Sequence, residues 1–186
     1  MEGPPSTTLV VVGDEAPAAI RSLTGFANVR AASFHDVPDA SDEDVARWSA
    51  HSSEPYVVHD RDPLGHVASA WVEFFEEQIT LGVLELEIDR AVEAAERHLI
   101  AVPDYYVVIH PEALPATWRH WWLGVIATAS PSRVIPWPAP GQRDLGDSLA
   151  GVLRRLPTGR AWPEVESWLP RVVGQVPDRV GLDGAA

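Results

Sequence analysis

Four apolar runs of this chain each end in residues of the kinds that hold metal ions or move protons. The runs are Leu9 to Val12 before Gly13-Asp14-Glu15, Val29 to Phe34 before His35-Asp36, Tyr56 to Val58 before His59-Asp60-Arg61-Asp62, and Tyr105 to Ile109 before His110-Pro111-Glu112. Helical patterns separate the runs, which favours parallel strands joined by right-handed crossovers. Open α/β sheets bind their ligands at the carboxyl ends of parallel strands, so this edge is where we expect a functional site.

The composition fits a globular protein with a sizeable core. The chain has 186 residues, of which 46% are hydrophobic, and it contains no cysteine, which excludes disulfides and thiolate metal sites. No apolar stretch approaches the roughly 18 residues of a membrane span, and the first residues lack the basic start of a signal peptide. We therefore expect a cytoplasmic protein without membrane contact.

The chain is strongly acidic, with a net charge of −13 from 27 acidic and 14 basic residues. Such a surface repels phosphate backbones at long range, so we do not expect nucleic-acid binding without a basic partner. A protein partner or a second copy of the chain remains a candidate ligand.

The order of the elements predicts an α/β fold with a mainly parallel central sheet and helices on both faces, ending in a β-hairpin and a helical appendage. The predicted strands span residues 7–12, 28–34, 55–58 and 105–109, with helices between them. We assign residues 1–138 to a Rossmann-like α/β domain. Residues 139–186 are assigned to a proline-rich linker and a C-terminal helical appendage.

The segment around residues 117–127 fits two structures. It fits a helix from Thr117, or a strand that pairs with 133–135 through the turn Ser130-Pro131-Ser132. The turn favours the strand pair, and on a strand adjacent tryptophans point to opposite faces. We therefore expect either Trp121 or Trp122 to be exposed, unless the C-terminal helices cover both.

Tryptophan and arginine gather in this segment. The cluster consists of Trp118, Arg119, Trp121 and Trp122. Exposed tryptophan beside arginine is typical of hot spots in protein interfaces, so these residues are the candidate partner-binding surface.

The sharpest local motif is Asp60-x-Asp62-x-x-Gly65 after the third run. Two carboxylates placed two residues apart on a strand exit can face one divalent ion, and carboxylates with open water positions suit Mg²⁺. The alternative is that the aspartates only cap a helix and form a turn, since Asp62 directly precedes Pro63.

This motif and Gly13-Asp14-Glu15 together resemble the Toprim domain of primases, topoisomerases and small maturation nucleases. That family runs strand, Glu-Gly turn, helix, strand, helix, and then a strand ending in Asp-x-Asp, and the resemblance covers about residues 7–75. Val12 stands where the family has its glutamate. The resemblance therefore passes the acid/base role to Asp14 or Glu15.

The resemblance implies divalent-metal-dependent phosphoryl transfer or phosphodiester hydrolysis, as in a Mg-dependent nuclease or phosphohydrolase, with Asp60 and Asp62 as metal ligands. His59 and His110 also follow strands, and we add them as a proton-transfer residue and a metal ligand. A zinc site made by His35, His59 and His110 has no recognised spacing. The alternative function is a non-catalytic protein-interaction module that binds its partner through Trp118 to Trp122.

Overall fold

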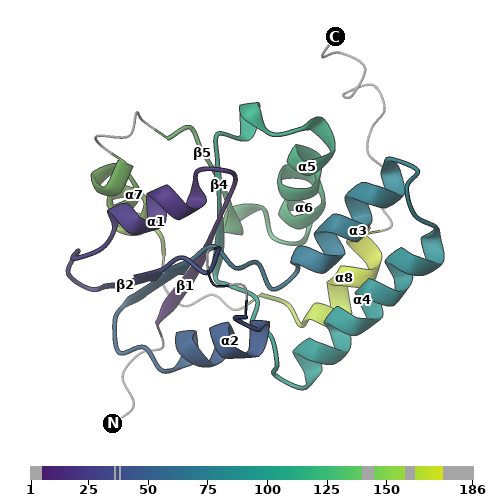
Figure 1. The fold of residues 1–186 in the computed structure, drawn as a ribbon, viewed down its shortest axis with the longest axis horizontal. Coiled ribbons are helices and arrows are strands. Elements are labelled where there is room, and N and C mark those ends of the chain that lie inside the picture. The colour runs from purple at the N-terminus through teal and green to yellow at the C-terminus, as the bar shows by residue number, and fades with distance from the viewer. Residues whose placement is uncertain (1–5, 36, 38, 140–144, 158–161, 174–186) are drawn as a thin grey trace.

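The computed structural model describes residues 6–35, 37, 39–139, 145–157 and 162–173. Its centre is a single five-stranded parallel sheet with the order β2-β3-β1-β4-β5 (Figure 1). The strands are β1 (Thr7–Val12), β2 (Val29–Ala32), β3 (Tyr56–His59), β4 (Tyr105–Ile109) and β5 (Val134–Trp137). The predicted α/β fold with a parallel sheet is confirmed.

Helices cover both faces of the sheet. They are α1 (Ala16–Ser22), α2 (Asp42–Ala50), α3 (Gly65–Phe75), α4 (Leu81–Glu96), α5 (Ala116–His120), the π-helix η2 (Trp121–Ile126), α6 (Ala127–Ala129), α7 (Leu145–Leu153) and α8 (Val165–Val173), with short 3₁₀ turns η1 (Pro111–Ala113) and η3 (Pro131–Arg133). Helices α1 and α7 pack on one face, whereas α3, α4, η2 and α8 pack on the other (Figure 1). Helix α2 lies on the opposite side of the sheet from α1.

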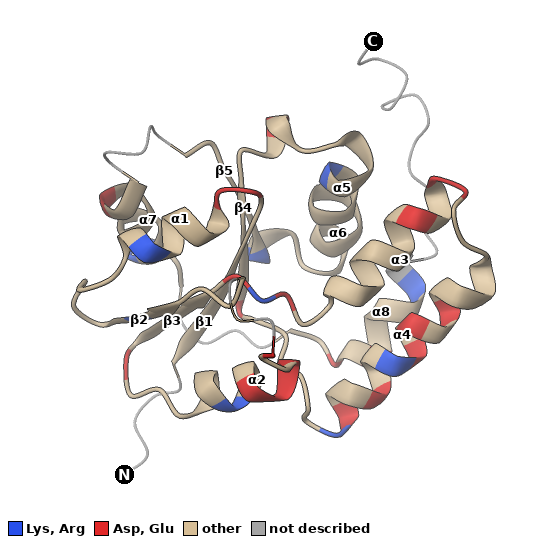
Figure 2. Cartoon of the chain, in the orientation of Figure 1, with Lys and Arg blue, Asp and Glu red and all other residues tan. Residues whose placement is uncertain are grey.

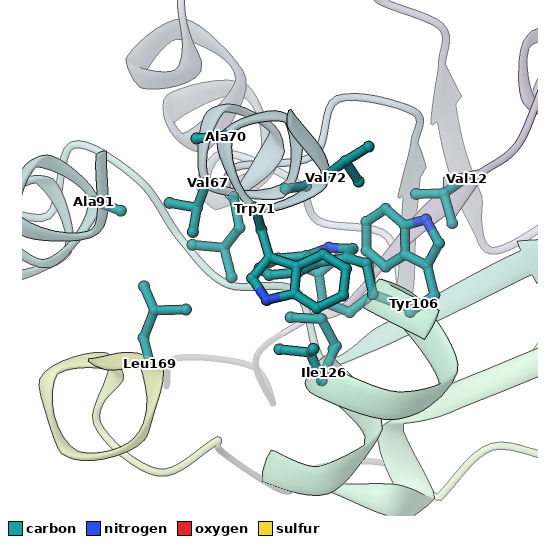
Figure 3. Close-up of a cluster of buried hydrophobic side chains, with 14 of the residues drawn as sticks. Val12, Val67, Ala70, Trp71, Val72, Ala91, Tyr106, Ile126 and Leu169 are labelled. Carbon is teal, nitrogen blue, oxygen red and sulfur yellow. The ribbon is translucent and has the colours of Figure 1, made fainter. Parts of the chain in front are cut away.

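The alternation of side chains along β1 divides the core between these two faces. Leu9 and Val11 point toward α1 and α7, whereas Val10 and Val12 point toward α3 and η2. Trp71 of α3 is fully buried on the face that α3 and η2 cover, and its ring centroid lies 5.7 Å from that of Trp121 (Figure 3). Both faces of the sheet are therefore shielded from solvent, as is usual for a parallel sheet.

Side chains at the start of α2 pair with its first backbone N–H groups. Ser41 and Asp44 form a capping box, in which the Ser41 hydroxyl accepts the Asp44 N–H at 3.1 Å and an Asp44 carboxylate oxygen accepts the Ser41 N–H at 3.2 Å. The box satisfies two of the backbone donors that a helix start leaves open. It places Asp42, in the first turn, at the carboxyl edge of the sheet.

The predicted β-hairpin is wrong. Residues 116–129 are helical, and β5 pairs with β4 in parallel, with Tyr106 opposite Val134. A helix buries Trp121, Trp122, Val125 and Ile126 on one continuous stripe. A strand would have turned half of this apolar run away from the core, so tertiary burial overrides the turn signal.

The packing of α7 on α1 leads to a stability prediction. A Cβ atom on Gly146 would lie 2.6 Å from the backbone oxygen of Ser22, which cannot move aside as a flexible side chain would. We expect Gly146→Ala to lower the free energy of unfolding by about 2 kcal/mol, the usual cost of overpacking. Urea unfolding followed by tryptophan fluorescence measures it.

Gly151 provides the matched control on the same helix. A Cβ there meets no atom within 4 Å, so Gly151→Ala gains helix propensity without a clash. We expect it to be neutral or to stabilise the protein by up to about 1 kcal/mol. Equal effects of the two substitutions would contradict the close approach of α7 to α1.

Candidate functional site

The exits of three strands meet at one edge of the sheet, because β1 lies between β3 and β4. In the register, His59 pairs with Val10, and Val108 pairs with Val12. The chain leaves β1 toward the α1 face and leaves β3 toward the α3 face, and such a reversal is where open sheets form crevices. The side chains predicted to form one site nevertheless divide into separate groups.

The first group surrounds the ends of β1 and β4. His110, at φ 43°, has its Nε2 3.8 Å from a Glu15 carboxylate oxygen and its Nδ1 3.2 Å from Glu112 Oε1. Gly13 adopts φ 118°, and a Cβ there would lie 3.0 Å from the backbone oxygen of Ile109, so the turn requires glycine. The three ionisable side chains are partly or largely exposed, and such surface pairs contribute little stability.

Asp60 belongs to a second group, which ties β3 to β2. One of its carboxylate oxygens accepts a hydrogen bond from the Ser33 hydroxyl, and the other accepts the Phe34 N–H at 2.6 Å. Both oxygens of Asp60 therefore fasten the loop after β2.

Asp62 turns the other way, toward α3 and β4. Its Oδ1 accepts the Leu64 N–H and the Tyr106 hydroxyl, each at 3.0 Å, while its buried Oδ2 has no hydrogen-bond partner among the described residues. Burial raises the pKa of this carboxyl to about 6, although the bonds from Leu64 and Tyr106 oppose the shift. The bond to Leu64 is the turn-forming contact that the alternative interpretation predicts.

The predicted magnesium ligands do not converge. Asp60 and Asp62 face different partners, and His110 lies in the group around β1 and β4. Within the described ranges, no three histidine, aspartate or glutamate side chains are placed to hold a metal ion. Asp36 lies outside the described residues. Because Asp60 and Asp62 do not face a common point, the present arrangement does not fit a shared ion, and the magnesium site stays a prediction.

His59 is buried, with 4% of its surface exposed. Its ring packs edge-on against Phe34 and Trp48, with centroids 6.1 Å away in both cases. Burial lowers the pKa of His59 to about 4, whereas Asp60 and a hydrogen bond to the backbone of Arg61 act in the opposite direction. The imidazole is therefore neutral at pH 7, and its Nδ1 has no hydrogen-bond partner in the described part of the chain.

A groove of about 530 Å³ opens between α3 and α4, beside the exit of β3. Its lining residues are Asp42, Pro63, His66, Val67, Ser69, Ala70, Glu73, Val83, Glu87, Arg90, Ala91, Ala94 and Ile100. We call it the α3–α4 groove. Figure 2 shows acidic residues along α4 and at the start of α2.

An ion pair lies beside the groove. Arg61 Nε lies 2.6 Å from Asp42 Oδ1, which links the start of α2 to the turn after β3. A side hollow of about 300 Å³ is lined by both members of this pair and also by Asp62, His66 and Ser69. The side hollow shares three lining residues with the α3–α4 groove, namely Asp42, His66 and Ser69.

Sequence reasoning missed this groove. The acidic residues of α3 and α4 fit an ordinary solvated helix face, and nothing in the local pattern shows how two helices pair. The only available signal was small residues among the acidic ones, namely Ala70, Ala91 and Ala94, which keep the space between the helices open.

The tryptophan cluster lies in the core. Trp121 and Trp122 are 0% and 5% exposed, so the expectation that one of them faces solvent is wrong. Trp168 of α8 belongs to the same buried cluster, as the alternative interpretation expects. Trp118 and Arg119 are partly buried. These residues stay a predicted partner-binding surface, but buried tryptophans offer little area to a partner.

In the described part of the chain, no helix combines the length and apolar character that crossing a membrane requires. Comparisons with protein-family models, curated proteins and solved structures give no match for this chain.

Proposed function

We propose that this protein is an interaction module whose α3–α4 groove binds a basic, amphipathic segment of a partner chain. The observation that carries the proposal is an open groove with an apolar floor and an acidic rim, on a chain of net charge −13. Such a groove suits a segment with apolar residues on one side and lysine or arginine on the other.

The floor supplies the hydrophobic contact. Ala70 and Ala91 have short side chains, which let a docked segment approach the backbones of α3 and α4. Val83, near the start of α4, also lines the groove and is 43% exposed. Burying such surface contributes about 25 cal/mol per Å². A helical partner with apolar residues three and four apart fits this floor.

The rim supplies the charge preference. Asp42, Glu73 and Glu87 line the groove; Arg90, 2.5 Å from Glu87, and Arg61, 2.6 Å from Asp42, offset two of these charges, which makes Glu73 the main source of the charge preference. Exposed charges of one sign raise the association rate of an oppositely charged partner and make binding depend on salt. We therefore expect a basic segment to bind faster and more tightly than a neutral or acidic one.

A charge reversal at Glu73 tests the proposal. The probe is a fluorescent synthetic helix with leucines along one face and lysines along the other, measured by anisotropy. Glu73→Lys should weaken its binding about tenfold, which corresponds to about 1.4 kcal/mol. The weakening should diminish at high salt.

Two controls accompany this experiment. Glu112→Lys makes the same charge change at an exposed residue outside the groove and should leave the affinity nearly unchanged. A peptide with glutamates in place of the lysines should not bind. Equal binding of both peptides, or equal effects of the two substitutions, would remove the proposal.

A second candidate function is divalent-metal-dependent phosphoryl transfer or phosphodiester hydrolysis at the carboxyl edge of the sheet. One observation favours it: β1 and β3 are neighbours, so Asp14 and Glu15 share an edge with the turn that carries Asp60 and Asp62. A calorimetric titration with Mg²⁺ and Mn²⁺ tests it beside an Asp60→Asn/Asp62→Asn variant. Binding that this variant loses would support the candidate, and the absence of specific binding would reject it.

A further inference from the structure

A pocket of about 310 Å³ lies at the amino ends of β2 and β3, on the face of the sheet that α1 and α7 cover. It is at the opposite edge of the sheet from the strand exits described above. Its lining residues are Phe26, Ala27, Asn28, Val29, Tyr56, Ala150, Leu153 and Arg154. We call it the α7 pocket. Its volume is at the lower limit of pockets that bind small molecules, about 300–1,000 Å³.

One wall of the α7 pocket comes from the loop between α1 and β2, which backbone hydrogen bonds hold in place. The Phe26 N–H donates to the Leu23 carbonyl oxygen at 3.1 Å. The Asn28 carbonyl oxygen accepts the Tyr56 N–H at 3.1 Å, which fastens the loop to β3. Asn28 adopts φ 66°, a left-handed conformation that asparagine enters more readily than most residues. This wall is therefore fixed in place, as in the largely pre-formed pockets that bind small molecules.

The body of the α7 pocket is apolar. Phe26, Val29 and Tyr56 pack against the core on this face and keep part of their surface exposed. Ala150 and Leu153 of α7 are buried and form its base. A ligand with an apolar body can therefore bury that body against two aromatic rings and one helix.

The rim of the α7 pocket carries a positive charge. Arg154 lies four positions after Ala150, and its N–H donates to the Ala150 carbonyl oxygen at 3.2 Å, so the two residues are neighbours on one face of the helix. Arg154 forms no ion pair within the described ranges, and no aspartate or glutamate lines the pocket. The α3–α4 groove and its side hollow, in contrast, are lined by carboxylates. On a chain of net charge −13, this pocket therefore has a local preference for an anion.

From this arrangement we infer that the α7 pocket binds a small monocarboxylate with an apolar body. A carboxylate accepts two parallel hydrogen bonds from a guanidinium group. The side chains of Tyr56 and Asn28 line the same pocket, have no hydrogen-bond partner in the part of the chain that the structure describes, and supply further donors. A phosphate or a dicarboxylate would bring a second negative charge, for which the lining offers no second cation.

This inference does not depend on the proposed function. The α7 pocket shares no lining residue with the α3–α4 groove. A small carboxylate and a basic segment could therefore bind to the same molecule, and each site is tested with its own probe.

Phenylacetate is the probe for the α7 pocket, and its binding is followed by the amide NMR shifts of Ala27, Asn28 and Ala150. We expect saturable shifts at millimolar concentrations, as is usual for a ligand of so few atoms. Phenylacetamide keeps the ring and lacks the charge, whereas acetate keeps the charge and lacks the ring. Each should bind at least about tenfold more weakly than phenylacetate.

Two substitutions at neighbouring residues test the role of the guanidinium. Arg154→Gln should weaken phenylacetate binding about tenfold, because it removes the charge and the paired donors. Arg155→Gln makes the same change at an exposed residue outside the pocket and should leave the affinity nearly unchanged. Both arginines are exposed, so neither substitution should disturb the fold.

Equal affinities for phenylacetate and phenylacetamide would overturn the inference, because the charge would then play no part in binding. Shifts that do not saturate, or equal effects of the Arg154→Gln and Arg155→Gln substitutions, would overturn it as well. Saturable shifts located along α3 and α4 instead of around the α7 pocket would place the carboxylate elsewhere and would also contradict it.

Discussion

Asp62→Asn is expected to make the stability of this protein more sensitive to acid. Burial raises the pKa of Asp62 to about 6, from 3.8 in the unfolded chain. Between these values the folded state binds more protons, so Asp62 adds stability as the pH falls from about 6 to about 4. One pKa unit corresponds to about 1.4 kcal/mol, which makes the whole contribution about 3 kcal/mol. The variant loses this gain.

Urea unfolding at several pH values between 4 and 7 measures the effect as the difference between variant and wild type. Asparagine keeps the oxygen that accepts the Leu64 N–H, so any cost of the new amide is nearly independent of pH. We expect the variant to lose about 3 kcal/mol relative to wild type as the pH falls through this window. A difference in the free energy of unfolding that stays the same at every pH would show that folding does not raise the pKa of Asp62.

His59→Phe is expected to have the opposite effect. Burial lowers the pKa of His59 to about 4, from 6.5 in the unfolded chain. The unfolded state then binds more protons, so His59 removes about 3 kcal/mol of stability as the pH falls from about 6.5 to about 4. Phenylalanine keeps a ring against Phe34 and Trp48 and has no proton to bind.

The variant should therefore gain about 3 kcal/mol relative to wild type on acidification, measured by the same unfolding series. The loss of the hydrogen bond to the Arg61 backbone lowers stability about equally at every pH, so it does not produce this dependence of stability on pH. The double variant Asp62→Asn/His59→Phe is the control, because the two opposite contributions nearly cancel in wild type. It should show the wild-type pH profile, and a slope like that of either single variant would contradict this cancellation.

The sheet was predictable because its signals are local. Continuous apolar runs with glycine or polar ends mark buried parallel strands, and the capping box at Ser41 marks the start of α2 from residues three apart.

The site was less predictable because its contacts are distant in sequence. Asp62 meets Tyr106, which lies 44 positions away, and Asp60 meets Ser33, which lies 27 positions away. The Asp-x-Asp spacing gives no indication of these partners, although they determine where each carboxylate points. The prediction for Trp121 and Trp122 was wrong for a related reason. An apolar run that fits both a helix and a strand adopts the secondary structure that its tertiary surroundings allow it to bury.

The most direct test of the interaction function is an amide NMR map of the protein titrated with the basic leucine–lysine helix. Binding in the α3–α4 groove predicts shifts along α3, α4 and the start of α2. It also predicts that they disappear in Ala94→Trp, whose larger side chain fills the groove. Shifts confined to the region of Glu15, His110 and Glu112, or shifts that survive in Ala94→Trp, would contradict it.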